Sequence, residues 1–477
     1  MAMTTTIKTT TTTPLPFSDR RQRAPRASLQ PPRCFPAWRV ASPAGPIVLA
    51  AAGTGGHVFP ALAVASALEQ RGVSSQDILF VTACVPPRFE GRAVPAAGRR
   101  LVSLTPGCPP LKRPVFLHLP RNVLVMLRLV MSTISACLFL LRVRPRAVFT
   151  TGGYGSLPVS LAARLLRVPS VAHELNATPG VATRVASWLG AVVLSGWDEE
   201  TLRAALPPWR RGGRRAGLYG PHRVVGVPTR PDVRAASRAV DDMRLYADGA
   251  GDEPARVLVL GGSLGAPDVW RAALAALPIA RRGQGSSSPP SLEATVQVGP
   301  GNLKEAEVFV ANSPACAFLR DDVARGGIRV TLLPFVDDIA QEYARADVVV
   351  ARSGASTCAE LLAAGRASVL LPLRPCPGDH QARNARRMEA GGAAVVVVDG
   401  RDVDGDVDGG DDEASTDETR AARVAAALSW FLANAGAEAR RAAAVARAEG
   451  DAQLGAEGRC ADALLAVAGG VGVRSKS

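Results

Sequence analysis

Two stretches of this chain repeat one local pattern: a short apolar run, a cluster of glycines and a helix-type sequence. In the first, the apolar residues 47–52 precede GTGGHVFP (53–60) and the periodic ALAVASALEQRG (61–72). In the second, ARVLVL precedes GGSLGA and a helical pattern within residues 255–277. A short apolar run bounded by glycine is typical of a buried parallel strand. The repeat therefore predicts two α/β units, each opening with a strand, a tight turn and a helix.

Further strand-type segments follow each opening unit. They lie within residues 77–83, 144–166, 169–180, 191–196 and 222–230, and then within 294–301, 328–335, 346–365 and 367–373. We predict an α/β protein with two Rossmann-like domains at 46–235 and 236–434, and C-terminal helices at 435–477 that pack back across the domains before a tail. Ligands bind at the carboxyl ends of parallel strands, so two facing sheets place the site in the cleft between them.

The formal charge of +14 raises the question of an anionic partner. Residues 1–45 hold one Lys and six Arg against one Asp, so they carry +6 and the remainder carries +8. Basic residues are not interleaved with aromatic ones as on an RNA-binding surface, which argues against nucleic acid. The eight cysteines form no C-x-x-C pair and no zinc spacing, which favours a reducing compartment.

The segment 1–45 is rich in Thr and Arg, is nearly free of acidic residues and has no apolar secretion core. It is typical of an organelle transit peptide, and its hydroxylated start favours a plastid over a mitochondrion. A disordered basic tail has the same composition. Two further segments are predicted as surface loops: the Gly/Ser/Pro-rich 281–293 and the acidic insertion 399–419, in which Ser415 stands where a calcium loop needs a bidentate Glu.

Residues 121–146 contain a long apolar stretch, and three interpretations fit it. It is nearly long enough to span a membrane, but Arg128 lies inside it and both flanks are basic. It also suits a packed helix of the first domain, or a packed helix whose outer face touches a membrane surface. Because a strand and a glycine turn follow at once, spanning ranks last and membrane contact first.

The first glycine turn has the form of an anion site without being a standard nucleotide motif. GTGGHVFP lacks the third glycine of G-x-G-x-x-G and the Lys-Ser/Thr pair of a P-loop. Glycines and a following helix N-terminus still favour phosphate or an oxyanion. His57 in this motif can exchange a proton near neutral pH, or it can simply bond locally at a helix start.

Four motifs fall at predicted strand ends: GTGGHVFP; GGYGSLP with HELN; GGSLGA; and RSGASTCAE with DHQARNA. From about residue 46 to the C-terminus, their order and separation resemble the MurG family, in glycosyltransferase family 28. This resemblance implies a GT-B fold and inverting transfer of N-acetylglucosamine from its UDP donor to the 4-hydroxyl of a lipid-linked muramoyl-pentapeptide. UDP-N-acetylglucosamine and the polyprenyl-linked acceptor are the expected partners. No metal or cofactor is expected, because the D-x-D pattern at 402–408 lies in the acidic insertion.

The resemblance also implies roles for individual residues. His57 corresponds to a catalytic histidine, Glu360 to a ribose-binding residue that we also place among the catalytic candidates, and Arg230 to an arginine near the diphosphate. The remaining substrate-binding candidates are Thr54, Gly55, Gly56, Asn176, Ser263, Val336, Ala355, Ser356, Thr357, Cys358, Ala359, Gln381 and Asn384. His173 and Glu174 are expected to shape the strand-end turn.

Three positions depart from the family pattern. Leu264 stands in GGSLGA where GGSQGA is frequent, Val227 in GVPTR where relatives have GNPVR, and Leu175 in HELN where they have HEQN. Two other functions therefore stay open from the sequence: a plastid galactosyltransferase acting on diacylglycerol, and a UDP-sugar-binding protein without activity. A plastid wall enzyme would act at the inner-envelope membrane, with 121–146 as its contact.

Overall fold

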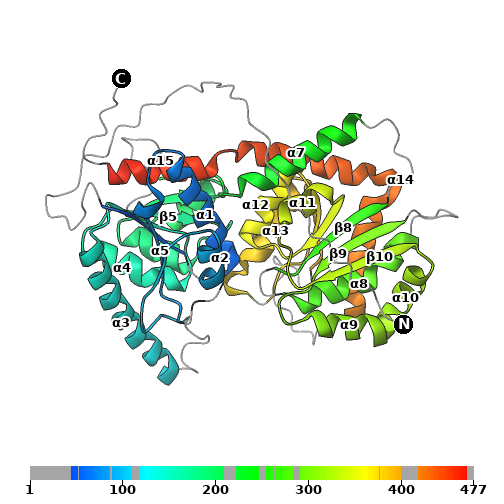
Figure 1. The fold of residues 1–477 in the computed structure, drawn as a ribbon, viewed down its shortest axis with the longest axis horizontal. Coiled ribbons are helices and arrows are strands. Elements are labelled where there is room, and N and C mark those ends of the chain that lie inside the picture. The colour runs from blue at the N-terminus through cyan, green and yellow to red at the C-terminus, as the bar shows by residue number, and fades with distance from the viewer. Residues whose placement is uncertain are drawn as a thin grey trace.

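This computed structural model describes residues 45–469 except 52, 86, 88, 110–118, 209–221, 247–253, 263–264, 283–290, 375 and 399–416. The predicted transit peptide therefore lies outside the described residues, save for residue 45, and so do most of the loop 281–293 and of the acidic insertion. Two parallel sheets with helices on their faces make up the described chain (Figure 1). This confirms the predicted α/β class.

The first sheet has the strand order β3-β2-β1-β4-β5-β6-β7. Its strands are β1 (Ile47–Ala50), β2 (Ile78–Thr82), β3 (Leu101–Ser103), β4 (Ala147–Thr150), β5 (Ser170–Glu174), β6 (Val192–Ser195) and β7 (Arg223–Val224). Its helices are α1 (Gly55–Glu69), α2 (Glu90–Ala96), α3 (Leu119–Val143), α4 (Leu157–Leu165), α5 (Val181–Trp188) and α6 (Glu199–Ala205). In the central register Ile47 lies between Ile78 and Ala147. These apolar strands are buried on both faces, as expected for a sheet covered by helices.

The second sheet has the order β10-β9-β8-β11-β12-β13. Its strands are β8 (Ala255–Leu260), β9 (Leu292–Gln297), β10 (Ile328–Leu333), β11 (Val348–Ala351), β12 (Ala367–Leu370) and β13 (Ala394–Val396). Its helices are α7 (Pro231–Tyr246), α8 (Pro267–Arg282), α9 (Leu303–Asn312), α10 (Ala317–Ala324), α11 (Ile339–Arg345), α12 (Ala355–Ala364) and α13 (His380–Ala390). The edge strands β3 and β13 were not predicted, because three partly exposed residues give too short a pattern to recognise.

Two C-terminal helices connect the sheets. α14 (Asp417–Ala452) packs on α8 and α12, whereas α15 (Ala456–Ala468) returns to α1 and to β4 and β5 of the first sheet (Figure 1). Cys460, Leu464 and Val467 are buried in the first core. The expected boundary at residue 435 falls inside α14, which is a continuous helix there. The chain thus ends by packing on the domain with which it began.

The apolar helix α3 lies on the outside of the first domain (Figure 1). By length and composition alone Arg121–Val143 could cross a membrane. Its inner side, however, packs on α4 and the sheet core through Val125, Ala136 and Leu140. Its outer side exposes large apolar side chains, namely those of Val123, Leu124, Met126, Leu127, Val130, Met131, Ile134, Leu138 and Leu141. A helix with one packed face and one apolar free face fits the packed interpretations and not a spanning one.

Candidate active site

Most of the motifs singled out in the sequence meet where the two sheets face each other. α1 of the first domain lies against α12 of the second, with α13 beside it (Figure 1). α1 follows β1, α12 follows β11 and α13 follows β12, so all three begin at carboxyl ends of central strands. This is the edge at which parallel sheets bind ligands.

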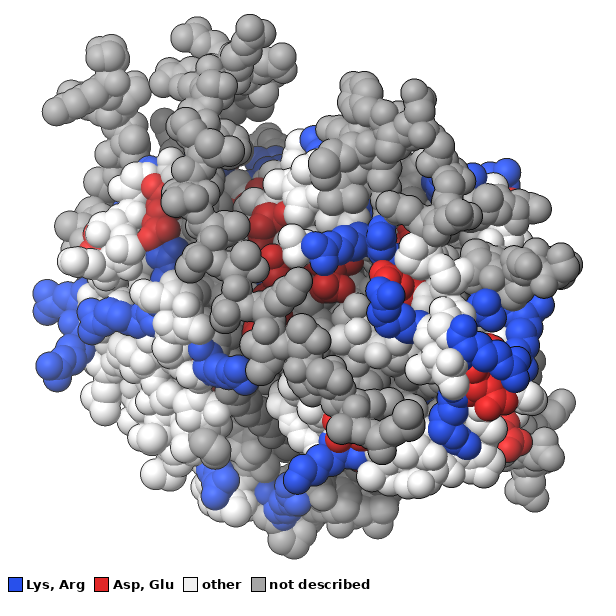
Figure 2. Space-filling view, turned by 45° about the vertical axis from the view of Figure 1, so that its right-hand side comes forward, with Lys and Arg blue, Asp and Glu red and all other residues white. Residues whose placement is uncertain are grey.

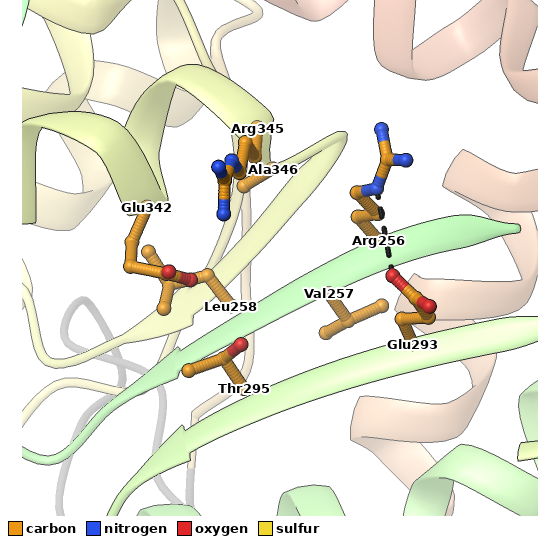
Figure 3. Close-up of a pocket in the computed structure, with 8 residues that line it drawn as sticks. All are labelled: Arg256, Val257, Leu258, Glu293, Thr295, Glu342, Arg345 and Ala346. Atoms are coloured by element: carbon orange, nitrogen blue, oxygen red, sulfur yellow. Dashed lines mark ion pairs between the residues drawn. The ribbon is translucent and has the colours of Figure 1, made fainter. Parts of the chain in front are cut away.

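A separate hollow of about 350 Å³ lies elsewhere in the second domain (Figure 3). It is lined at the start of β8 and β9 and at the end of α11, and Arg256 and Glu293 form an ion pair of 3.6 Å there. These are the amino ends of the strands. The hollow therefore lies at the opposite edge of the sheet from the sequence motifs and does not belong to the candidate site.

The first glycine turn is held by a buried acid that sequence reasoning missed. Glu90 is fully buried, and it accepts from the Gly53 N–H (3.0 Å) and the Thr82 hydroxyl (2.8 Å). Gly53 has φ +101°, a conformation that favours glycine. A side chain on Gly55 would meet the rings of Phe59 and Phe89 at 3.2 and 3.3 Å. Nothing in the segment FEGR identified Glu90 as a loop anchor, because its partners are distant in sequence.

α1 begins earlier than the sequence predicted, so His57 lies in its first turn and not in a loop. The carbonyl of the N-cap residue Thr54 accepts from the N–H of His57 (3.1 Å) and of Val58 (3.3 Å). The helix pattern was predicted only from residue 61 because the small and aromatic residues of 55–60, with Pro60, mask its periodicity. Thr54 itself is exposed at the helix start.

The ring of His57 is oriented by Thr151, which follows β4. Its Nδ1 lies 2.8 Å from the Thr151 carbonyl, and the Thr151 hydroxyl donates to the His57 carbonyl at 3.0 Å. Because a carbonyl only accepts, Nδ1 carries the proton, and Nε2 is left as the basic nitrogen. Burial lowers the pKa of His57 below its ordinary value of 6.5. His57 is therefore a neutral imidazole at pH 7, suited to accept a proton.

The segment HELN forms a strand-end turn, as expected. Glu174 accepts from the backbone N–H groups of Asn176 (3.0 Å) and Gly180 (2.8 Å), and His173 Nε2 lies 2.9 Å from the Gly226 carbonyl. Burial lowers the pKa of His173 to about 4, so this ring is a neutral brace between β5 and the segment after β7. Asn176 is placed by Glu174, which also accepts from its side-chain nitrogen at 3.2 Å.

Asn384 joins the two domains through hydrogen bonds. It is fully buried, it accepts the Ala177 N–H (2.8 Å), and its amide donates to the Ser353 carbonyl (3.1 Å) and to Asn176 Oδ1 (3.3 Å). Gln381 is half-buried, and its Oε1 accepts from the Leu373 N–H at 2.9 Å, which orients its amide.

The start of α12 presents backbone N–H groups toward α1. Helices leave their first N–H groups without intrahelical partners, and the first bond here runs from Cys358 N to the Gly354 carbonyl (2.9 Å). The N–H groups before Cys358 thus lie at a helix N-terminus, a place that generally favours anions, at the domain junction. The Ser356 hydroxyl donates a hydrogen bond to the Gly56 carbonyl of α1 at 2.8 Å. The Cys358 side chain is fully buried in the core of the second domain.

Arg230 and Glu360 are partners of each other. Arg230 Nη2 lies 3.4 Å from Glu360 Oε1, and the Tyr343 hydroxyl donates to Oε2 at 3.2 Å. The guanidinium of Arg230 also lies 4.7 Å from the centre of the Phe59 ring. Burial raises the pKa of Glu360, while Arg230 and Tyr343 oppose that shift. Glu360 is thus a buried acid held by Arg230 and Tyr343, and its expected ribose contact stays a prediction.

Two of the three departures from the family pattern have a structural explanation. Leu175 and Val227 pack with Ala355 and Ala359 of α12 in a small apolar cluster between the domains. Their side chains are buried there, where an apolar side chain fits the surroundings. The third departure, Leu264, lies outside the described residues, as does the expected diphosphate-binding Ser263. Val336 is buried in the second core, and Thr357 lies in the first turn of α12.

Comparison with known proteins gives one family for both halves of the chain. Residues 47–195 match the glycosyltransferase family 28 N-terminal domain, and residues 256–410 match the glycosyltransferase family 28 C-terminal domain. A Xylella fastidiosa (strain M12) protein is 34% identical over 360 residues, covering 75% of this chain and 83% of the relative. The chain belongs to the MurG family, within glycosyltransferase family 28.

The members of this family found most similar share a name. The Xylella relative and a Xanthomonas campestris pv. campestris (strain 8004) relative, 34% identical over 89% of this chain and 82% of its own, are both named UDP-N-acetylglucosamine--N-acetylmuramyl-(pentapeptide) pyrophosphoryl-undecaprenol N-acetylglucosamine transferase. The crystal structure of Acinetobacter baumannii MurG is 25% identical, with a TM-score of 0.58, over 88% of this chain and 98% of that one. The glycosyltransferase SnogD from Streptomyces nogalater shares the fold, with a TM-score of 0.51 at 20% identity. The GT-B fold expected of a MurG family member is confirmed.

Proposed function

We propose that this protein transfers N-acetylglucosamine from UDP-N-acetylglucosamine to the muramoyl 4-hydroxyl of a polyprenyl-diphospho-muramoyl-pentapeptide, a step of peptidoglycan synthesis. Family membership and the shared name of the relatives support this activity. Within the structure, the supporting observation is the neutral His57 ring, held at Nδ1 by Thr151 with Nε2 available for a proton.

The reaction is an inverting displacement. The acceptor 4-hydroxyl oxygen attacks the anomeric carbon of the donor sugar while the bond from that carbon to the UDP oxygen breaks. The hydroxyl proton passes to His57 Nε2, and UDP leaves with the electron pair. A β-1,4 linkage results from the inversion.

Negative charge that develops on the leaving UDP needs stabilisation. The N-terminus of α12 offers unpaired N–H groups and the positive end of the helix dipole, and Arg230 lies at the same junction. For the expected diphosphate contact, the Arg230 guanidinium has to bond to the ligand as well as to Glu360. We propose that these groups suffice without a metal ion, which transfer in the presence of EDTA would test.

The deciding experiment is an assay of labelled N-acetylglucosamine transfer to a short-chain lipid-linked muramoyl-pentapeptide. Protein lacking residues 1–45 should form product, and the His57→Ala variant should lose most of it. No product with this acceptor but transfer of galactose to diacylglycerol would replace the proposal with a galactolipid activity. Binding of UDP without either product would indicate a non-catalytic protein.

We also propose that the outer face of α3 contacts the membrane that holds the lipid-linked acceptor. Its exposed apolar side chains are accompanied by exposed Arg121, Arg128, Arg142 and Arg144, which suit anionic headgroups. Figure 2 shows that the lower surface of the first domain is largely uncharged, with basic side chains upon it.

The proposed location is the inner-envelope membrane of a plastid. The Thr- and Arg-rich composition of residues 1–45 supports a transit peptide. A fluorescent protein carrying residues 1–60 should enter isolated chloroplasts and be shortened there. Import into mitochondria alone, or no import, would contradict this location.

A further inference from the structure

One hydrogen bond joins the first turn of α1 to the first turn of α12. The Ser356 hydroxyl donates to the Gly56 carbonyl at 2.8 Å, across 300 positions in sequence. Ser356 is 9% exposed, so little water competes for this bond. The two helices belong to different domains, and the bond therefore exists only while the domains are together.

The Gly56 carbonyl is available because of Pro60. In an α-helix this carbonyl would accept from the N–H four residues later, and proline has none. Pro60 lies inside α1, so the helix itself supplies no such donor. Gly56 also has no side chain, and a Cβ there would lie 3.4 Å from Thr54 Oγ1 and 3.9 Å from Ser356 Oγ. The sequence thus leaves an acceptor open at the position that Ser356 meets.

The two residues stand beside the two halves of the proposed reaction. Ser356 is the second residue of α12, whose N–H groups form the proposed diphosphate site. Gly56 directly precedes His57, whose ring is fixed by the Thr151 carbonyl. The Ser356 hydroxyl therefore connects the start of α12 to the backbone carbonyl that directly precedes His57.

We propose that Ser356 is a positioning residue whose hydroxyl, through the carbonyl freed by Pro60, couples donor binding at α12 to the placement of His57. The inference rests on the proposed function, in that the donor is a UDP-sugar. In this proposal the Ser356 hydroxyl bonds to α1 and not to the ligand, and the Ser356 backbone N–H donates to the diphosphate.

The first test needs no turnover. Hydrogen–deuterium exchange of the peptide 53–60 is measured with and without saturating UDP, in the unaltered protein and in Ser356→Ala. UDP should slow exchange in the unaltered protein by about three- to tenfold more than in the variant, the range expected for one hydrogen bond. The control is Ser66→Ala, because that hydroxyl bonds within α1 to the Leu62 carbonyl. Equal protection in Ser356→Ala and the control would overturn the proposal.

The second test separates positioning from ligand binding by kinetics. Ser356→Ala should lower kcat about three- to tenfold with little change in the KM for UDP-N-acetylglucosamine. A raised KM with unchanged kcat would instead show that the hydroxyl binds the donor. If no variant transfers sugar but the exchange difference persists, the proposed function fails while the coupling between the helices stands.

Pro60→Ala supplies the missing N–H and gives an independent check. When residue 60 has an N–H, the Gly56 carbonyl can accept a hydrogen bond within α1 and needs the Ser356 hydroxyl less. The UDP-induced protection should therefore already be smaller in the single variant Pro60→Ala. In the Pro60→Ala background the further change to Ser356→Ala should alter protection less than twofold. If the effects of Pro60→Ala and Ser356→Ala on the UDP-induced protection were fully additive in the double variant, the proposed role of Pro60 would be contradicted.

Discussion

At the scale of single residues, the chemistry of this site depends on partners that are distant in the chain. His57 has its basic nitrogen selected by the carbonyl of Thr151, and Glu90 holds the Gly53 N–H. Glu360 is held by Arg230 and Tyr343. The same residue types in another environment would have other protonation states and other functions.

The pH dependence of transfer should report on His57. The neutral ring is the active form, and burial places its pKa below 6.5. As the pH drops below 6.5, the ordinary pKa of histidine, the rate should therefore stay high at first. It should fall only when the pH passes through the lowered pKa of His57 in the folded protein. kcat/KM measured from pH 5 to 8 should show this acid limb below 6.5.

The His57→Ala variant provides the control for this profile. It should be slower at pH 7.5 by about 10²- to 10⁴-fold, the usual contribution of a positioned base. Its residual rate should lack the acid limb. A limb centred above pH 6.5 in the unaltered protein would contradict a lowered pKa for the base.

At the scale of elements, burial distinguishes helices that look alike in sequence. α3 and α12 are both apolar, but α12 is buried along most of its length and α3 on one side only. α1 carries its functional turn ahead of its apolar repeat, and so its start was misplaced by the pattern. Periodicity in the sequence showed where most helices lie. Whether a helix is buried or presents a free face depended on what each of its faces contacts.

The outer face of α3 should be needed for lipid binding and not for folding. Leu127 and Met131 are 57% and 58% exposed, one turn apart on that face. Leu127→Glu with Met131→Glu should abolish co-sedimentation with vesicles containing anionic lipid, since buried charge at the interface is costly and acidic groups repel the headgroups. The melting temperature should change little, because neither side chain is packed.

A matched control comes from the second domain. Val308 on α9 is 58% exposed, and Val308→Glu makes a similar surface change away from α3. This variant should bind vesicles like the unaltered protein. Equal loss of binding in both variants, or none in either, would show that α3 is not the membrane contact.

At the scale of the whole molecule, the two domains are joined by several different contacts. Asn384 bonds to the segment after β5, α15 returns to the first core, and Leu175 and Val227 pack on α12. Two of the departures from the family pattern, Leu175 and Val227, thus lie in the junction itself. In this chain their contact with α12 is apolar.

Restoring a family-type side chain at this junction should destabilise the protein. Leu175→Gln places an amide in a cluster formed with Val227, Ala355 and Ala359, where Leu175 is 1% exposed. Burial of an unpaired amide costs about 1–3 kcal/mol on protein scales. The free energy of unfolding from urea titration should fall by that amount.

The exposed Leu165 is the comparison for this prediction. It is 68% exposed on α4, and Leu165→Gln should leave the free energy of unfolding within about 0.5 kcal/mol of the original. An unchanged stability in Leu175→Gln would mean that the junction opens or rearranges to satisfy the amide.

The sequence by itself determined the α/β class, the two repeated units and most central strands, because these depend on local apolar runs and glycine turns. It also located most motif residues at strand ends, including His57 and the strand-end brace Glu174. Only the tertiary structure decided that Glu90 anchors the first turn, that Asn384 joins the domains and that Ser356 meets Gly56. Hydrogen bonds and buried contacts between distant segments leave no periodic trace in the chain, and so their partners become known only when the two sheets are brought face to face.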